Sequence, residues 1–387
     1  MKSLLMLVAL AFFAMLPLQA TPVVPNTSFK PGEIWHDTNG VAINAHGGGL
    51  YKEKGTYYWF GEHKVGGDAG NQAQVGVHCY SSKDLLNWKD EGIALKVAAP
   101  DSDSLIAQGC ILERPKVIYN KKTRKYVMWF HLEVKGKGYG SAFSGRAVSD
   151  KVTGPYQFVK AGRINPGKWP MDIPKEKQTL DNAPAVPRLE GSWYPEGMDE
   201  TAFFKRDFKD GQMARDMTLF VDAKEKAYHI YSSEENGTMH IAELSDDYLD
   251  HTGKFVRVFK GRFMEAPAIC KKDGTYYLIA SGCTGWSPNA ARMAVAKSIW
   301  GPWKELKNPC VGKDAEKTFD GQSTFILPVA KKDGETTYLF LADIWRPQNA
   351  IDGRYMWLPI SFDGDQMIIE WKDEWKLQNK FPKMIDC

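Results

Sequence analysis

The chain has 387 residues, and its 50 Lys and Arg against 47 Asp and Glu give a formal net charge of +3. This near balance argues against nucleic acid as a partner, because phosphate binding needs a concentrated basic surface. With 43% hydrophobic and 25% charged residues, disordered, collagen-like and coiled-coil chains are excluded. An aromatic content of 12%, with 35 Gly and 21 Pro, favours a β-rich protein with many turns.

The first twenty residues predict an export signal. Lys2 precedes an apolar run from Leu4 to Leu18, and Ala20 ends a plausible cleavage site. The run is shorter than the roughly 20 apolar residues that a membrane span needs. We therefore expect a signal peptide over residues 1–20. The mature protein, residues 21–387, is expected to be periplasmic or extracellular, without membrane insertion.

Six cysteines are scattered along the chain: Cys79, Cys110, Cys270, Cys283, Cys310 and Cys387. Export permits disulfides, so one or two bridges are compatible with this content, although no pairing is specified. None of the cysteines has CxxC spacing, so a zinc cluster is not expected. We expect no cofactor and no metal, with a metal ion in a channel as the open alternative.

One pattern occurs five times: an apolar strand, a turn of Lys, Asp and Gly, and an aromatic strand. The copies lie at residues 49–62, 117–131, 219–232, 268–280 and 326–342. Turn residues between such runs predict β-hairpins. A further segment follows most copies, at residues 81–88, 149–156 and 297–303, where a third strand would turn into a fourth. Five four-stranded units predict an all-β, single-domain, five-bladed β-propeller rather than one long β-sandwich.

Residues 161–213 break the repeat. This stretch is rich in Pro, Gly and aromatic residues, as in Trp169-Pro170 and Phe203-Phe204. We interpret it as an insertion between the second and third blades. Loops of this length usually form functional lids or rims.

The inner strand of each propeller blade lines the central channel, so the residues at its head should face a common site. The five head positions hold polar side chains: His46, Glu113, Asp216, Glu265 and Gln322. A single glutamate there would be typical of a surface strand end. Five equivalent positions instead predict one site with coupled carboxylates. Two alternatives stay open: Arg215 could hold Asp216 as a structural pair, and His46 could close the channel by hydrogen bonding.

Convergent carboxylates in an aromatic-lined funnel favour glycoside hydrolysis. One carboxylic acid protonates the leaving oxygen, and a second group activates water or attacks the anomeric carbon. Trp59 and Trp129 are expected in the blade core, whereas Trp286 and Trp345 lie at Gly- and Pro-rich strand ends and are the preferred sugar platforms. The sequence contains no nucleophile elbow, P-loop, dinucleotide fingerprint or HExxH motif.

At these positions the chain resembles glycoside hydrolase family 43, most closely its exo-1,3-β-galactanase branch, over essentially the whole mature length. The motifs that carry the resemblance are residues 45–49, 59–62, 113–116, 215–216, 265–267, 285–289 and 345–347. The resemblance implies a five-bladed propeller with inverting, exo-acting chemistry. It implies that the enzyme releases galactose from β-1,3-linked galactan, as found in plant arabinogalactan.

The resemblance also implies roles for the catalytic residues. Glu265 would be the general acid, and Asp216 the carboxylate that tunes its pKa. Most of the family has a catalytic-base Asp on the first blade, but residues 44–46 here contain no carboxylate. In the galactanase branch a glutamine matching Gln322 holds the water and is the base candidate. Glu113 would contact the sugar or act as the alternative base. The acid and the water-holding group are expected about 6.5–9.5 Å apart.

We expect an oligo- or polysaccharide as the partner. The candidate substrate-binding residues are His46, Glu62, Tyr139, Thr284, Trp286, Trp345 and Arg346. Two alternatives stay open at this point. One is an α-L-arabinofuranosidase or β-xylosidase of the same family, and the other is a non-catalytic glycan-binding propeller that has lost its base.

Overall fold

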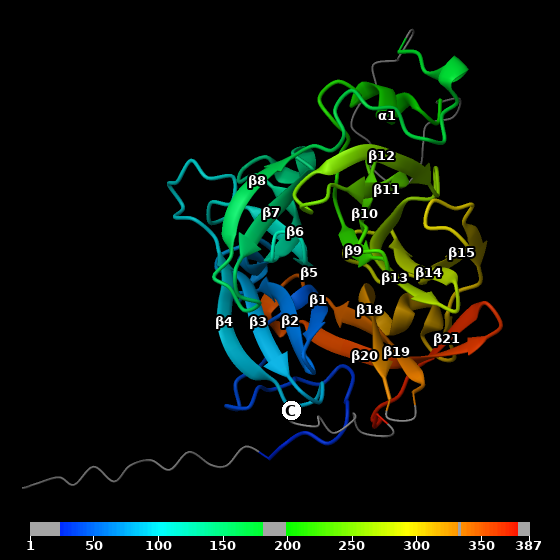
Figure 1. Cartoon of the computed structure of the whole chain (residues 1–387). Helices are drawn as coiled ribbons and strands as arrows, with labels where there is room; N and C mark the ends of the chain where they lie inside the picture. Colours follow the sequence, from blue (N-terminus) through cyan, green and yellow to red (C-terminus); the bar gives the residue numbers. More distant parts are fainter. Residues whose placement is uncertain (1–23, 181–198, 332–333, 378–387) are drawn as a thin grey trace, which may run out of the picture.

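The computed structural model describes residues 24–180, 199–331 and 334–377. Five small sheets, antiparallel except for one short edge strand, surround a central channel (Figure 1), which confirms the predicted five-bladed β-propeller. The expected signal peptide and Cys387 lie outside the described residues. Within those residues no disulfide joins the remaining five cysteines, and no helix is long and apolar enough to cross a membrane.

Four strands build each blade, from the channel outwards. Blade one contains β1 (His46–Glu53), β2 (Thr56–His63), β3 (Gly76–Ser82) and β4 (Lys89–Lys96). Blade two contains β5 (Ile111–Asn120), β6 (Lys125–Glu133), β7 (Phe143–Ser149) and β8 (Gln157–Gly162). Blade three contains β9 (Met217–Val221), β10 (Ala227–Ser233), β11 (Thr238–Leu244) and β12 (His251–Val258).

Blade four contains β13 (Met264–Lys272), β14 (Thr275–Gly282), β15 (Arg292–Ala296) and β16 (Lys304–Leu306). Blade five contains β18 (Gln322–Ala330), β19 (Thr336–Ile344), β20 (Arg354–Asp363) and β21 (Gln366–Glu370), with β17 (Cys310–Val311) parallel to β21 at its edge. The short helices of the described residues are η1 (Asp68–Asn71), η2 (Gly138–Gly140), η3 (Lys175–Lys177), α1 (Ala202–Arg206), η4 (Ala315–Asp320) and η5 (Ala350–Asp352).

Each predicted hairpin forms the first two strands of a blade. The pairs are β1–β2, β5–β6, β9–β10, β13–β14 and β18–β19. The three segments expected to turn a third strand into a fourth do so, between β3 and β4, β7 and β8, and β15 and β16. The repeat was readable because each hairpin combines turn residues with β-branched and aromatic strands.

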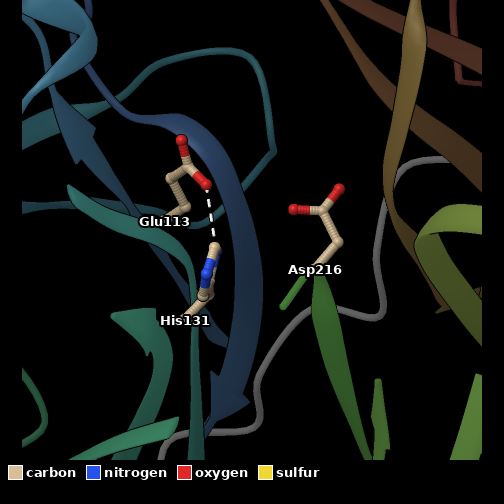
Figure 2. A group of neighbouring side chains, drawn as sticks. All are labelled: Glu113, His131 and Asp216. Carbon is tan, nitrogen blue, oxygen red and sulfur yellow. Dashed lines mark hydrogen bonds and ion pairs between the residues drawn. The ribbon is translucent and has the colours of Figure 1, made fainter. Parts of the chain in front are cut away.

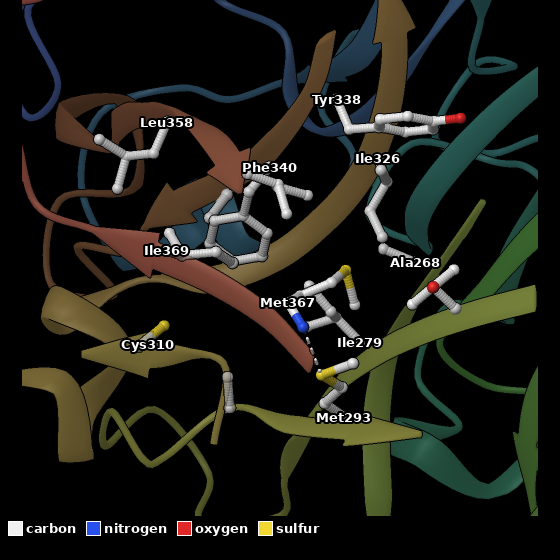
Figure 3. Packing of buried hydrophobic residues seen from close by; sticks show 14 of the residues in the cluster. Ala268, Ile279, Met293, Cys310, Ile326, Tyr338, Phe340, Leu358, Met367 and Ile369 are labelled. Carbon is white, nitrogen blue, oxygen red and sulfur yellow. Dashed lines mark hydrogen bonds between the residues drawn. The ribbon is translucent and has the colours of Figure 1, made fainter. Parts of the chain in front are cut away.

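The apolar core lies between blades rather than in one centre. Because each sheet is covered on both faces, a second strand such as β6 is buried at nearly every position. Between blades four and five, Ile279 and Met293 pack against Ile326, Phe340 and Leu358 (Figure 3). Burying one such side chain contributes about 1.5–3 kcal/mol. Five clusters of this kind join successive blades and fix the orientation of the inner strands.

The ring closes between blades one and five. Their inner strands β1 and β18 are in contact. Trp59 of β2 and Trp357 of β20 share the intervening cluster, with ring centroids 4.8 Å apart. The chain ends add to the closure, because Phe29 pairs through its backbone with Trp375 and stacks on it at 4.4 Å.

The segment between β8 and β9 contains η3 and α1 and packs on blade three. The amide of Met171 donates to the carbonyl of Phe255 on β12 at 2.8 Å, and Phe204 lies in the cluster beneath. In Figure 1 this segment lies beyond β12, on the outer side of the ring. Residues 181–198 lie outside the described residues. None of the described residues between 161 and 213 lines the cavity at the channel end.

Candidate active site

Backbone bulges lie at the heads of four inner strands. The pairing register shifts between Glu113 and Lys116 on β5, and between Glu265 and Ala268 on β13. Similar shifts occur near the starts of β1 and β18. Neighbouring residues on a regular strand point to opposite faces. At the β5 bulge, where Arg114 has a φ of 57°, both Glu113 and Arg114 line the same cavity.

This cavity has a volume of about 340 Å³ and receives residues from all five blades. Its lining consists of Glu62, Lys64, Glu113, Arg114, His131, Tyr139, Arg215, Asp216, Asn236, Glu265, Gly285, Trp286, Gln322 and Trp345. Both acidic and basic side chains line it, and two of the lining residues, Trp286 and Trp345, have their indole rings next to each other. The volume is in the range of small-ligand sites.

Glu265, at the start of β13, is a carboxyl group that holds its proton at neutral pH. Burial and then the nearby negative charge of Asp216 raise its pKa to about 8. The Asn236 side chain donates to Glu265 Oε1 at 2.7 Å, and the thiol of Cys283 hydrogen-bonds the same carboxyl group. A buried, protonated carboxyl in a cavity is the form that a general acid needs.

Asp216 lies directly before β9 and is held by blades two and four. Its Oδ2 accepts hydrogen bonds from Arg114 Nη2 at 2.9 Å and from the amide of Ala266 at 3.0 Å. Arg215 instead donates to Glu235 at 2.9 Å. The alternative in which Arg215 pairs with Asp216 is therefore wrong. Through Ala266, Asp216 is tied to the residue next to the acid Glu265.

Glu113 is held as a carboxylate by His131 of β6. Its Oε2 lies 3.0 Å from His131 Nδ1 (Figure 2), and its Oε1 accepts from the Tyr139 hydroxyl at 3.2 Å. Burial raises the pKa of Glu113, but the hydrogen bond and charge of His131 outweigh it and lower the pKa to about 2. The opposite ring nitrogen, Nε2, lies 3.0 Å from Glu133 Oε1.

Glu113, His131 and Asp216 place potential ligand atoms within 4.8 Å of one another (Figure 2). A metal ion would need a ring nitrogen with an unused lone pair. Both nitrogens of His131 already face carboxylates at hydrogen-bond distance. The histidine of this group therefore does not fit a metal-ligand role.

The amide of Gln322, at the start of β18, is fixed by three side chains. Its Oε1 accepts from Arg114 Nη2 at 2.5 Å and from Trp345 Nε1 at 2.9 Å. Its Nε2 donates to the Ser281 hydroxyl at 2.9 Å. A carbonyl oxygen has two lone pairs and an amide nitrogen two hydrogens. Gln322 therefore has one N–H that can donate to a ligand.

Glu62, at the end of β2, pairs with Lys64 and supports the β5 bulge. Its Oε2 lies 2.6 Å from Lys64 Nζ, and its Oε1 accepts from the amide of Arg114 at 3.0 Å. Burial raises the pKa of Glu62, against the lowering effect of Lys64. Gly47, with a φ of 60°, leaves room for this carboxylate, because a Cβ there would collide with it.

Two indole rings form an apolar wall. Trp286 is 48% exposed, and its ring meets that of Trp345 nearly perpendicularly, at 71° and 6.1 Å between centroids. Trp59 and Trp129, in contrast, are buried between blades. The preference for Trp286 and Trp345 as cavity-facing rings thus agrees with their positions.

A solved structure described as the GH43 β-1,3-galactosidase BT3683 with galactodeoxynojirimycin is 52% identical to this chain. The match covers 90% of this chain and 100% of that one, with a TM-score of 0.82. The chain belongs to glycoside hydrolase family 43. The model of glycosyl hydrolases family 43 itself matches residues 176–352. No curated protein sequence matches the chain.

Two further family 43 relatives are exo-β-1,3-galactanases. The enzyme from Phanerochaete chrysosporium, solved with β-1,3-galactotriose, is 29% identical over 91% of this chain and 68% of that one, with a TM-score of 0.72. The enzyme from Clostridium thermocellum is 32% identical over 90% of this chain and 66% of that one, also with a TM-score of 0.72.

Most residues that the sequence predicted for this family 43 site line the cavity, but three do not. His46 is buried beside it, with its ring stacked on Tyr355 at 5.0 Å and its Nδ1 3.4 Å from Asp343. Its Nε2 lies 3.4 Å from the Tyr355 hydroxyl, so both polar partners of the ring belong to blade five, and the closing of the channel by His46 stays a prediction. Thr284 and Arg346 also lie outside the lining. Thr284 donates to the carbonyl of Ser287 within its own loop.

Sequence reasoning missed several cavity residues of this family 43 chain. Arg114 was visible only as part of the motif at residues 113–116, because a regular strand would have turned it away from the channel. Lys64 and Asn236 lie just after second strands, and His131 lies within one, so the search for inner-strand heads passed over them. The polar residues that end β2, β6 and β10 were the available signal.

Proposed function

We propose that this family 43 enzyme is an inverting, exo-acting galactan 1,3-β-galactosidase. The observation that supports the proposal most is the protonated Glu265 beside ionised carboxylates, in a chain half identical to a β-1,3-galactosidase over that enzyme's full length. The galactotriose complex of the fungal relative adds support for a β-1,3-linked galactan as the substrate class. The preferred natural source is the β-1,3-galactan of plant arabinogalactan.

In this proposal Glu265 donates its proton to the glycosidic oxygen as the bond to the terminal galactose breaks. Burial, and then the negative charge of Asp216, keep that proton on Glu265 at neutral pH. A catalytic acid of this kind contributes roughly a hundredfold to ten-thousandfold in rate. Asn236 fixes the direction of the carboxyl group by donating a hydrogen bond to its Oε1 atom.

Water adds to the anomeric carbon from the opposite face and gives the α-configured product. The free N–H of Gln322 donates to this water and holds it, while a carboxylate of the cavity takes the proton that the water loses. An oxygen that already accepts two hydrogen bonds, one of them from a guanidinium, is poorly suited to take that proton. Glu113 stays ionised, which suits an acceptor of that proton or of a sugar hydroxyl.

The floor of the cavity supports an exo mode of action. Arg114 lines the cavity, while Lys116 lines a separate hollow of about 660 Å³ whose lining residues are all different. The Lys116 ammonium donates to the carbonyls of Gly47 and Arg114 at 3.1 and 3.3 Å. Both side chains are buried, and the two hollows share no lining residue, so we infer that the cavity is closed at this end and that a glycan enters it by its own end.

We also propose that the protein is exported and acts in the periplasm or outside the cell. The support is the charged and apolar character of residues 1–20. An external enzyme would meet a polysaccharide that cannot cross a membrane.

The test is an NMR assay that resolves the anomeric form of the first product from 1,3-β-galactan and 1,3-β-galacto-oligosaccharides. Arabinofuranosyl and xylosyl substrates are assayed alongside. Release of α-galactose from chain ends is the expected result. Arabinose or xylose release would keep the fold and the acid but overturn the substrate. Tight binding without any product would favour a non-catalytic glycan-binding propeller.

A further inference from the structure

A chain of three side chains runs from the cavity wall into blade two. Glu113, on β5, faces His131 Nδ1 at 3.0 Å, and Glu133 faces His131 Nε2 at 3.0 Å. His131 and Glu133 are two residues apart on β6, so both point to the same side of the strand. Glu133 is fully buried, and its Oε2 also accepts from the amide of Ala142 at 2.8 Å.

With both glutamates ionised, this geometry is compatible with one protonation state of the ring. A neutral imidazole has one N–H, so it can donate to only one of two carboxylates and would turn a lone pair towards the other. A doubly protonated ring donates to both, and its positive charge offsets two buried negative charges. Burial lowers the pKa of His131, but Glu113 and Glu133 outweigh it and raise the pKa to about 9.

We propose that His131 and Glu133 are positioning residues that keep Glu113 ionised and aimed into the cavity. Glu133 accepts a hydrogen bond from Nε2 of the imidazolium, and Nδ1 of the same ring donates to Glu113. The Tyr139 hydroxyl, donating to the other oxygen of Glu113 at 3.2 Å, completes the orientation. In this way blade two places an internal cation behind the carboxylate. The proposal rests on the proposed function only in that Glu113 is taken to accept a proton or a sugar hydroxyl during catalysis.

Other charged or titratable groups face Glu113 from neighbouring elements. They are Lys64 and Glu62 at the end of blade-one strand β2, Arg114 on β5, Tyr139 of η2 and Asp216 before β9. Lys64 and Arg114 also lower the pKa of Glu113, after the larger effect of His131. Removing the charge of His131 should therefore raise this pKa without returning it to the value of an isolated buried carboxyl.

Neutron diffraction of the wild-type protein, exchanged into D₂O at neutral pH, tests the protonation state without substrate. We expect a deuteron on both ring nitrogens of His131. A ring with one deuteron would overturn the proposal. Because no turnover is needed, this result is independent of whether galactan is the substrate.

The double variant His131→Gln with Glu133→Gln tests the consequence for catalysis. The amide at position 131 can still donate to Glu113, and the amide oxygen at position 133 can still accept from Ala142. Neither amide carries a positive charge at any pH, so Glu113 loses the cation also in the acidic range where it titrates. We expect the acidic limb of the pH profile of kcat/KM to move up by about one to two pH units. A folded variant with an unmoved limb would overturn the proposal.

Asp90→Asn is the matched control. It removes a carboxylate that lies 2.7 Å from a ring nitrogen of His78 on the outer strands of blade one, away from the cavity. We expect its pH profile to equal that of the wild type. A wild type that releases no galactose would defeat the proposed function, whereas the neutron result would still decide the state of His131.

Discussion

The guanidinium of Arg114 donates to the side-chain oxygen of Gln322 at 2.5 Å, and the same nitrogen donates to Asp216 at 2.9 Å. One arginine on blade two thus ties the water-holding candidate on blade five to the pKa-tuning carboxylate before blade three. A planar guanidinium can hold both partners in fixed directions, which a lysine cannot do. These hydrogen bonds fix the orientation of the Gln322 amide, because they occupy its oxygen and leave one N–H of its nitrogen for a ligand.

Arg114→Lys and Trp345→Phe should loosen the amide of Gln322. A lysine lacks the planar guanidinium that donates to both Gln322 and Asp216, so we expect kcat of Arg114→Lys to fall by about a hundredfold. Trp345→Phe removes one neutral donor, so a fall of about fivefold to tenfold is expected. Steady-state kinetics on a 1,3-β-galacto-oligosaccharide measures both. Trp371→Phe, which removes an exposed indole N–H, should match the wild type. Equal activity of all variants would contradict the positioning role.

Glu265→Gln should abolish turnover and preserve ligand binding. The amide keeps the shape of the carboxyl group and can still form hydrogen bonds, but it is not acidic enough to transfer a proton to the leaving oxygen. We expect kcat to fall by about a thousandfold, while calorimetry with galacto-oligosaccharides gives a similar Kd. The control Glu316→Gln changes an exposed glutamate of η4. Unchanged turnover in the Glu265 variant would remove it from the acid role.

The alkaline limb of the pH profile should report Glu265. This group must be protonated to act, and its pKa is raised to about 8, so kcat/KM should fall as the pH rises above about 8. Asp216→Asn removes the negative charge that helps to hold the proton. The pKa of Glu265 then decreases, and the limb should move to lower pH by about one unit.

A comparison with Asp363→Asn, an exposed aspartate at the end of β20, controls for general loss of charge. Its limb should stay in place. A limb that moved to higher pH in Asp216→Asn would contradict the sign of the coupling between the two carboxylates.

Trp286→Ala should weaken substrate binding more than it affects folding. The ring is half-exposed at the cavity wall, so its loss removes a stacking surface and little core. We expect KM for galactan to rise roughly tenfold with a small change in kcat, and the melting temperature to stay near that of the wild type. Trp59→Ala, in the closure between blades one and five, should instead cost about 3–5 kcal/mol of unfolding free energy.

The repeat of hairpins was enough to predict the propeller. Alternation, turn residues and aromatic strands are local properties, so they can be read along the chain. The same periodicity identified the heads of the inner strands, and four of the five predicted head residues, Glu113, Asp216, Glu265 and Gln322, line one cavity. The fifth, His46, does not line it, because its ring packs against Tyr355 and Asp343 of blade five, and the periodicity of one strand does not show a contact between blades.

The sequence by itself determined the fold and the blade from which each acid comes. The tertiary structure decided which side chains pair. Arg114 reaches Asp216 over 102 positions of sequence and Gln322 over 208, and Arg215 turns away from its neighbour to Glu235. The protonation of Glu265 and the ionisation of Glu113 also depend on burial and on charges from other blades. Such effects depend on distance in space, which the packing of the blades sets and sequence spacing does not.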